Sequence, residues 1–234
     1  ENYTLSDTLS LHDALPILRE QQADGGKRMK VESIVLGSIG TNCYIVTNEE
    51  TKECFAVDMA ECPQEYVNYI KNNGLEMKAL FLTHGHFDHI MGIDDFLKAF
   101  PVPVYAGEDE LPVIEDDRLN VSCMYGPKYA FHGAQPVRDG QVIECAGIEV
   151  DVLHTPGHTV GGCCYYLPKE HRLFCGDTLF CASIGRTDLP TGSSSQLVRS
   201  VQEKIMTLPD DTKIYPGHME ETSVQFEKEH NPFI

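Results

Sequence analysis

The sequence predicts an α/β protein in which helices cover two internal β-sheets. Short runs rich in Val, Ile, Tyr and Phe recur along the chain and are separated by Gly, Asn and Glu, which is typical of strands. Segments with apolar residues at helical spacing occur in both halves. The 234 residues are 41% hydrophobic and 23% charged, enough for one large domain or two closely packed halves. Two similar halves of strands followed by helices favour a layered sandwich.

Residues 1–28 do not share this pattern. They show weak periodicity and end in a Gly-Gly turn, after which Met29 opens a strand-like segment. The stretch resembles translated cloning sequence, so we expect a non-native or disordered leader followed by one domain over residues 29–234. The alternative is a short native helix over residues 10–20, with Ser10 as its N-cap.

In the first half, apolar runs bounded by turn residues predict strands over residues 31–36, 43–47, 54–57, 77–82 and 102–105. A helix is expected over residues 63–74, because Pro63 stands near its start and Gly74 at its end. Its apolar stripe consists of Tyr66, Val67 and Ile70. A second, shorter helix is expected over residues 93–100.

Residues 107–136 are polar and irregular, and we expect a weak helix and a loop that forms a lid or a linker. The sequence after them predicts strands over residues 142–145, 148–153, 163–167, 173–175 and 213–215. Ser193 and Gln196 have the spacing of a capping box, which predicts that a helix begins there. Its apolar residues are spaced by four: Leu197, Val201 and Ile205.

The composition argues against several classes of function. The formal net charge is −18, and the 18 Lys and Arg residues are spread along the chain, so we expect no nucleic-acid partner. No apolar run is long enough to cross a bilayer, and we expect no membrane partner. The nine cysteines form no C-x-x-C pair, and we find no secretory signal. We therefore expect a cytoplasmic protein with reduced thiols.

The segment FLTHGHFDHIMG, residues 81–92, carries the strongest functional signal. Four polar groups follow a strand-like run directly: His84, His86, Asp88 and His89. Burying them without partners would be costly, and imidazole and carboxylate are the usual ligands of zinc, iron and manganese. His84 and His86 share one face of an extended segment and can bind one ion. Asp88 and His89 come as the chain turns into a helix and can reach a second ion.

Three more polar residues follow predicted strands in the second half. They are His158 in TPGHT, Asp177 in CGDT and His218 in PGH. Functional groups gather on loops that a rigid sheet positions. Two ions would need three further ligands, one of them shared, and these residues supply that number. Taken singly, each of the three is explained equally well as a hydrogen-bonded core residue.

Together these motifs resemble the metallo-β-lactamase superfamily, whose T-H-x-H-x-D-H signature matches THGHFDH and whose later motifs match TPGHT, GDTLF and PGH. The resemblance runs from Met29 to the end, and GRTDLPTGSSSQL and HNPFI are similar to the small glyoxalase II-type hydrolases. It implies a four-layered αββα sandwich. It also implies two metal sites, metal 1 with His84, His86, His158 and Asp177, and metal 2 with Asp88, His89, His218 and the same Asp177.

The activity implied by this resemblance is metal-dependent hydrolysis of a thioester, such as a hydroxyacyl-glutathione or a related thiol conjugate. Two adjacent divalent ions, zinc first with iron or manganese as alternatives, would share a water and lower its pKa, so that a bridging hydroxide attacks the carbonyl. A thiol leaves as thiolate without a strong general acid, whereas an amide needs one. Asp88 and Asp177 are the candidate catalytic carboxylates, although ligation should occupy Asp88.

Arg186, Tyr165 and Tyr166 are the candidate substrate-binding residues. Arg186 is better explained by a loop-bracing ion pair with Asp188, and one of the two tyrosines is expected to face the core. Larger glyoxalase II enzymes carry a C-terminal helical extension that grips glutathione. This sequence ends sixteen residues after His218, so we expect no glutathione-binding extension of this kind. No motif specifies the thiol part of the substrate or the oligomeric state.

Other functions share this framework. An iron-dependent persulfide dioxygenase would have the same fold and a similar GRTD stretch but would use one iron, so the complete second ligand set disfavours it. A lactonase, a β-lactamase or a nuclease of the superfamily is a further alternative. The acidic composition disfavours the nuclease, and the lack of a secretory signal disfavours a periplasmic lactamase.

Overall fold

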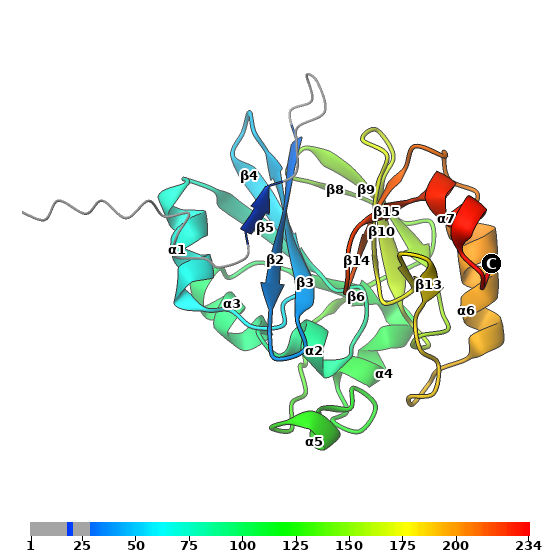
Figure 1. The fold of residues 1–234 in the computed structure, drawn as a ribbon. Helices are drawn as coiled ribbons and strands as arrows, with labels where there is room; N and C mark the ends of the chain where they lie inside the picture. Colours follow the sequence, from blue (N-terminus) through cyan, green and yellow to red (C-terminus); the bar gives the residue numbers. More distant parts are fainter. Residues whose placement is uncertain (1–17, 21–28) are drawn as a thin grey trace, which may run out of the picture.

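Two β-sheets face each other in the middle of the computed structural model, which describes residues 18–20 and 29–234 (Figure 1). The first sheet contains, in spatial order, β1 (Leu18–Glu20), β2 (Met29–Leu36), β3 (Thr41–Asn48), β4 (Glu53–Val57), β5 (Glu76–Phe81), β6 (Val104–Gly107) and β7 (Gln135–Val137). The second contains β15 (Thr222–Ser223), β14 (Lys213–Pro216), β11 (Arg172–Gly176), β10 (Cys163–Leu167), β9 (Ile148–His154) and β8 (Val142–Cys145). A small hairpin pairs β12 (Leu179–Phe180) with β13 (Ser183–Ile184).

Helices cover the outer face of each sheet, which confirms the αββα sandwich (Figure 1). On the side of the first sheet lie α1 (Gln64–Asn72) and α3 (Ile93–Ala99), and on the side of the second lie α6 (Ser194–Ser200) and α7 (Val224–His230). The helix α6 continues into η3 (Val201–Ile205). Four short helices complete the chain: α2 (Phe87–Ile90), η2 (Glu108–Glu110), α4 (Leu111–Ile114) and α5 (Ser122–Tyr125).

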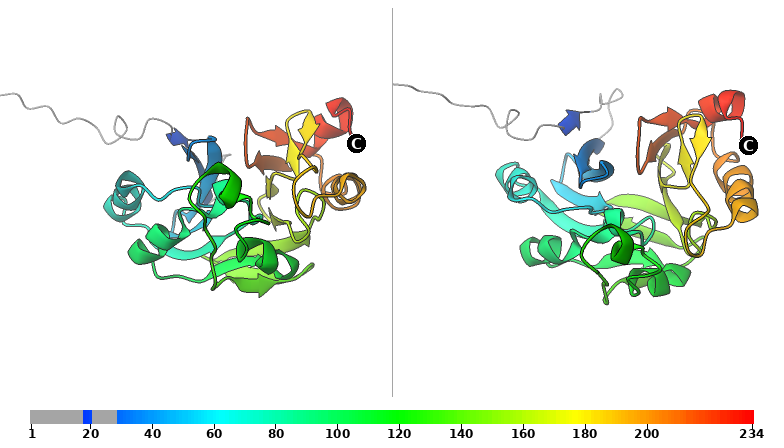
Figure 2. Two further views of the ribbon diagram at one scale, coloured as in Figure 1. Left: turned by 90° about the horizontal axis from the view of Figure 1, so that it is seen from below. Right: turned by 60° about the horizontal axis from the view of Figure 1, so that its bottom comes forward.

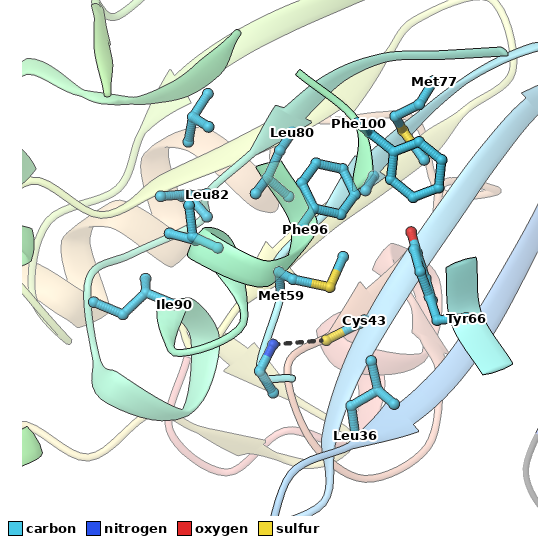
Figure 3. Close-up of a cluster of buried hydrophobic side chains, with 14 of the residues drawn as sticks. Leu36, Cys43, Met59, Tyr66, Met77, Leu80, Leu82, Ile90, Phe96 and Phe100 are labelled. Atoms are coloured by element: carbon cyan, nitrogen blue, oxygen red, sulfur yellow. Dashed lines mark hydrogen bonds between the residues drawn. The ribbon is translucent and has the colours of Figure 1, made fainter. Parts of the chain in front are cut away.

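The end of strand β5 and the residue after it form an unbroken apolar run over residues 79–82. Leu80 and Leu82 point to one face and pack with Tyr66 and Phe96 of the helices, the cluster drawn in Figure 3. Phe81 points to the other face and packs between the two sheets. A strand that is covered on both faces needs apolar residues at successive positions, because neighbouring side chains alternate between the faces.

Strand β10 has the same property in the second sheet. Tyr165 belongs to the core between the sheets, whereas Tyr166 packs on the helix side with Val201 and Ile205. The sequence placed one tyrosine in the core and left the other free to line a pocket. Both are buried, because helices cover the face that we expected to be open.

Most expected elements are present, with ends that differ by one or two residues. The segment expected as a lid or linker contains η2, α4, α5 and the start of β7. The expected helix after Ser193 forms, but the Ser193 side chain makes no capping hydrogen bond. Its backbone N–H instead donates to the carbonyl oxygen of Gly157 at 2.8 Å.

Only three residues of the expected leader are described, and its non-native or disordered character stays a prediction. Leu18–Glu20 forms an edge strand that pairs antiparallel with β2, with Leu18 opposite Ile34. The helix considered for residues 10–20 therefore does not extend over this part. The remainder of that prediction, residues 1–17 and 21–28, lies outside the described residues. Within the part of the chain that the structure describes, no helix is both long and apolar enough to cross a membrane.

One edge of the sandwich collects the carboxyl ends of several strands. In the first sheet, β4 and β5 run parallel, and in the second sheet β11 and β14 do so. Two backbone hydrogen bonds join the sheets at this edge: Cys163 N–H donates to Thr83 O at 2.8 Å, and Asn42 N–H donates to Gly217 O at 2.7 Å. Seen from the end where α5 lies, the loops that follow these strands come toward the viewer (Figure 2).

Truncating Phe81 should weaken the packing of the two sheets. Its ring lies 5.0 Å from the ring centroid of Tyr165 and 5.2 Å from those of Phe55 and Tyr105, and it is fully buried. We expect Phe81→Ala to lower the free energy of unfolding by about 3–5 kcal/mol, because it leaves a cavity in a dry core. Urea denaturation measures this value. The matched control is Phe233→Ala, at a ring that is 52% exposed, and equal losses in both variants would contradict the packing described here.

Candidate metal centre

The structure brings the seven predicted ligand side chains together at the edge where the two sheets meet. Three overlapping groups have ligand atoms within 4.8 Å of one another: His84, His86 and His158; His84, His89 and Asp177; Asp88, His89 and His218. Each residue lies just after a strand or in the short helix α2. The motif in the first half and the three separate motifs in the second half therefore form one cluster.

His84, His86 and His158 form the first group. The Nδ1 atom of His86 lies 2.9 Å from Nε2 of His158, so the two rings aim at one point. Burial lowers the pKa of His86 to about 3, and it lowers the pKa values of His84 and His158 below their ordinary value. All three imidazoles are therefore neutral at pH 7, which is the form that binds a metal.

Asp88, His89 and His218 form the second group. The Nε2 atoms of His89 and His218 lie 3.5 Å and 3.1 Å from Oδ2 of Asp88. Burial alone would lower the pKa of both histidines, but the surrounding carboxylates outweigh it and raise both values. For Asp88 the effects are reversed. Burial alone would raise its pKa, but the two histidines outweigh burial and hold the pKa below its ordinary value. A metal ion that binds here would therefore compete with protons for His89 and His218.

Asp177 stands between the two groups. Its Oδ1 atom lies 3.4 Å from Nε2 of His89, and its Oδ2 atom lies 3.7 Å from Nε2 of His158 and 3.6 Å from Nε2 of His218. One carboxylate therefore faces imidazoles of both groups. This position is the one that a bridging ligand needs.

The cluster fits divalent metal ions better than any arrangement of internal hydrogen bonds. The Nε2 atoms of His84 and His89 and Oδ1 of Asp177 are buried with no hydrogen-bond partner in the described part of the chain. Orphaned buried polar atoms are costly, and a cation in their midst would satisfy several at once. Imidazole nitrogens with carboxylate oxygens suit zinc, iron and manganese.

Asp58 orients the cluster and was missed by the sequence reasoning. Its Oδ2 atom lies 2.8 Å from Nδ1 of His89 and accepts a hydrogen bond from Oγ1 of Thr83 at 2.7 Å, while its Oδ1 accepts from the Thr83 N–H at 2.8 Å. This contact fixes which nitrogen of His89 faces the cluster. The sequence contains a signal for Asp58, because this residue follows the apolar run of β4 just as the metal ligands follow their strands.

Glu110 is a second residue that the sequence reasoning missed. It is fully buried, and its two oxygens accept hydrogen bonds from the N–H groups of Gly85 at 2.7 Å and Gly161 at 2.8 Å. Gly85 lies between His84 and His86, and Gly161 follows His158 by three residues. One carboxylate thus joins the ligand loops of both sheets. Within an acidic run of three residues, no pattern marks this one as buried.

Two glycines let the loops approach closely enough to form the cluster. A Cβ atom on Gly217 would lie 2.2 Å from Oδ1 of Asp177 and 2.7 Å from Cε1 of His89. Gly176 has a positive φ of 49°, and a Cβ there would lie 2.2 Å from Oγ1 of Thr83. Any side chain at these positions would displace a ligand or the residue that supports it.

A cavity of about 450 Å³ opens beside the cluster. Its lining includes His86, Asp88, His158, Asp177 and His218, together with apolar side chains from several loops and Arg186. The Arg186 guanidinium donates to both carboxylate oxygens of Asp188, from Nε at 2.7 Å and from Nη2 at 2.8 Å. The ion pair that we expected is present, and Arg186 also reaches the cavity.

The two tyrosines do not contribute to this lining, so their assignment to substrate binding is corrected. Tyr165 is fully buried, and its hydroxyl donates to the carbonyl oxygen of Leu82 at 2.7 Å. Tyr166 is 7% exposed and belongs to the core between the second sheet and its helices. Alternation along a strand that is covered on both faces directs neither ring to the cleft.

Comparison with known families and proteins agrees with this geometry. The family model described as the metallo-beta-lactamase superfamily matches residues 36–218. The probable metallo-hydrolase YqgX of Bacillus subtilis is 34% identical over 208 residues, covering 88% of this chain and 98% of that protein. The hydroxyacylglutathione hydrolase GloC of Haemophilus influenzae is 28% identical over 214 residues, covering 88% and 98%.

Two solved structures are similar over most of their length. The BLEG-1 B3 metallo-beta-lactamase superposes with a TM-score of 0.82 at 36% identity, covering 87% of this chain and 98% of that one. TTHA1623 in a di-iron-bound form superposes with a TM-score of 0.77 at 31% identity, covering 86% and 99%. TTHA1623, a protein similar to this chain in sequence and fold, has thus been solved with two iron ions bound.

Neutralising Glu110 should change how stability depends on pH. Burial raises the pKa of Glu110 from its ordinary 4.5 to about 7, so the folded protein keeps a proton that the unfolded chain loses between these values. The stability that this proton contributes is fully present below pH 4.5 and is lost as the pH rises to about 7. The free energy of unfolding of the wild type, minus that of Glu110→Gln, should therefore fall across this window and be flat above it.

Urea denaturation of metal-free protein at several pH values measures this difference. The control is Glu108→Gln, at an exposed carboxylate that is paired with Arg138. A hydrogen bond from Arg138 lowers the pKa of Glu108, so this substitution should leave the slope between pH 4.5 and 7 unchanged. A difference for Glu110→Gln that stays constant with pH would contradict the assignment.

Proposed function

Because this chain belongs to the metallo-beta-lactamase superfamily, we propose that it is a hydrolase that uses two divalent metal ions to cleave a thioester. The observation that carries the proposal is the shared carboxylate: Asp177 faces both His158 of the first group and His89 and His218 of the second. We assign His84, His86, His158 and Asp177 to one ion, and Asp88, His89, His218 and Asp177 to the other.

The chain's own residues fix the orientation of two imidazoles at this site. Asp58 holds His89 in one orientation, and the carbonyl oxygen of Arg186 lies 2.8 Å from Nδ1 of His158 and does the same for that ring. When bound, the two ions would supply Lewis acidity and lower the pKa of a water toward neutrality. The cavity beside them admits a small molecule.

The lining of the cavity favours a leaving group that needs no proton. Among the described residues that line it, the only carboxyl groups are Asp88 and Asp177, and ligation would occupy both. A thiol has a pKa near ~8.5 and leaves as thiolate, whereas an amide nitrogen must be protonated as it leaves. This chemistry supports a thioester, and the related GloC carries the name of a thioester hydrolase.

A second candidate is the hydrolysis of a β-lactam. It is favoured by the likeness to the BLEG-1 B3 metallo-beta-lactamase over 98% of that chain. Both candidates use the same ions and the same attack on a carbonyl carbon. They differ in the leaving group, which is a sulfur in one case and a ring nitrogen in the other.

Removal of the shared carboxylate should abolish both metal sites at once. We expect the wild type to bind two metal ions per chain and Asp177→Ala to bind neither tightly, with kcat/KM reduced at least ~100-fold. Elemental analysis after dialysis measures the stoichiometry. The control is Asp210→Ala, at an exposed carboxylate paired with Lys228 far from the cluster. A variant that retains both ions and wild-type turnover would refute the bridging role.

A parallel assay of metal-loaded protein decides between the functions. It compares a thioester, a lactone, a β-lactam, a phosphodiester, and a persulfide with oxygen monitoring. We expect the thioester to give the largest kcat/KM. Oxygen consumption with the persulfide, or β-lactam turnover above that of the thioester, would replace the proposed activity. Protein loaded separately with zinc, iron and manganese identifies the ion that supports turnover.

A further inference from the structure

The cleft has two limbs that meet beside the metal ligands. The first, which we call the apolar limb, is the cavity of about 450 Å³ described above. The second, which we call the acidic limb, is a cavity of about 460 Å³ toward α1 and α3. Both are lined by Phe87, Asp88 and Tyr125. The rings of Phe87 and Tyr125, which both limbs share, stack with centroids 5.2 Å apart and planes 7° apart. A thioester has two arms, one on each side of its carbonyl, and this cleft offers a place for each.

The apolar limb carries large apolar side chains that the fold leaves exposed. Ile39, Tyr125 and Met219 are 50%, 55% and 59% exposed and come from three separate segments: the β2–β3 turn, α5 and the β14–β15 loop. Phe180, Ile184 and Leu189 line the same limb. Exposed apolar groups that converge on a cavity from different segments are typical of a surface that binds an apolar ligand.

In the described part of the chain, the acidic limb is lined by no positively charged side chain. Among the described residues that line it, the charged side chains are Glu61, Asp88 and Asp95, and none is Lys, Arg or His. Across the described lining of both limbs, Arg186 is the only Lys or Arg. Its guanidinium is already held by both oxygens of Asp188. The chain as a whole carries a formal net charge of −18.

Resting on the proposed function, we propose that the substrate is a thioester without anionic groups, whose apolar arm lies in the apolar limb against Ile39, Tyr125 and Met219. A glutathione arm carries two carboxylates. Apart from the metal ligands, the charged side chains that they would meet in the described lining are Glu61, Asp95 and Arg186, and Arg186 is already paired with Asp188. A charge that loses water without gaining a partner is strongly disfavoured. A neutral arm suffers no such loss and gains from burial against the exposed side chains of the apolar limb.

Matched pairs of ligands test this inference with the zinc-loaded protein. The substrate pair is S-lactoylglutathione and its dimethyl ester, and the uncleavable pair is S-hexylglutathione and its dimethyl ester. Within each pair the ester lacks the two carboxylate charges and carries two added methyl groups. We expect each ester to be preferred at least ~10-fold, in kcat/KM for the first pair and in affinity for the second. The preference should persist at 1 M salt, where long-range repulsion is screened.

The outcomes separate this inference from the proposed function. Equal or better turnover of the free acid would overturn the inference and leave the thioester hydrolase intact. Loss of the preference for the ester at high salt would also overturn the inference. The preference would then arise from long-range repulsion by the net charge of the protein and not from the lining of the cleft. If no thioester is cleaved, the proposed function fails, and the S-hexyl pair alone decides whether the cleft selects neutral ligands.

Variants locate the effect in the cleft. Tyr125→Ala and Met219→Ala should each weaken binding of the S-hexyl ester, whereas Met124→Ala should not. Met124 is the matched control, because it is 58% exposed on the same helix as Tyr125 and lines neither limb. Asp188→Asn should release Arg186 and improve binding of the free acid relative to its ester. Equal effects of Tyr125→Ala and Met124→Ala, or no change in Asp188→Asn, would contradict the proposed cleft.

Discussion

The metal centre depends on holding the edges of two separate sheets at a fixed distance. Four of its ligands follow β5 in one sheet, and three follow strands of the other. Glu110 meets this requirement directly, because one buried carboxylate accepts hydrogen bonds from the loops of both ligand sets. The hydrogen bond between Cys163 and Thr83 ties the same two loops through the backbone. An ion between the loops adds a further link, so metal binding and the packing of the sandwich are coupled.

The electrostatics of the centre follow from burial and from where the carboxylates lie. The first group has three buried imidazoles that burial keeps neutral. In the second group, burial lowers the pKa values of His89 and His218, but the carboxylates outweigh it and raise both above the ordinary value. Asp177 touches both groups, and its own pKa stays below the ordinary value because the neighbouring imidazoles outweigh the effect of burial. Two divalent ions would compete with protons at the second group and give the orphaned nitrogens a partner.

Much of this architecture could be predicted from the sequence, because buried strands and ligand loops have local signatures. The seven ligands follow apolar runs, five of them sit beside a glycine that permits close approach, and the structure assembles all seven. Asp58 obeyed the same rule and was overlooked. The burial of Glu110 depends on the segment from residue 107 onward folding against the ligand loops, which no local pattern encodes. The two tyrosines were misplaced because alternation identifies two faces but not what covers each.

The separation of the ligands from the apolar lining of the cleft explains how one centre can serve different substrates. The ligands lie at the ends of strands and in α2, where the sheets fix their positions. Ile39, Tyr125 and Met219 of the apolar limb instead come from the β2–β3 turn, α5 and the β14–β15 loop. Substitutions in these loops can change which arms fit without moving a ligand. A chain can therefore keep the ions and their chemistry while its substrate changes. For this reason the motif THGHFDH predicts the reaction class, whereas our proposal for the substrate rests on the charge and shape of the two limbs.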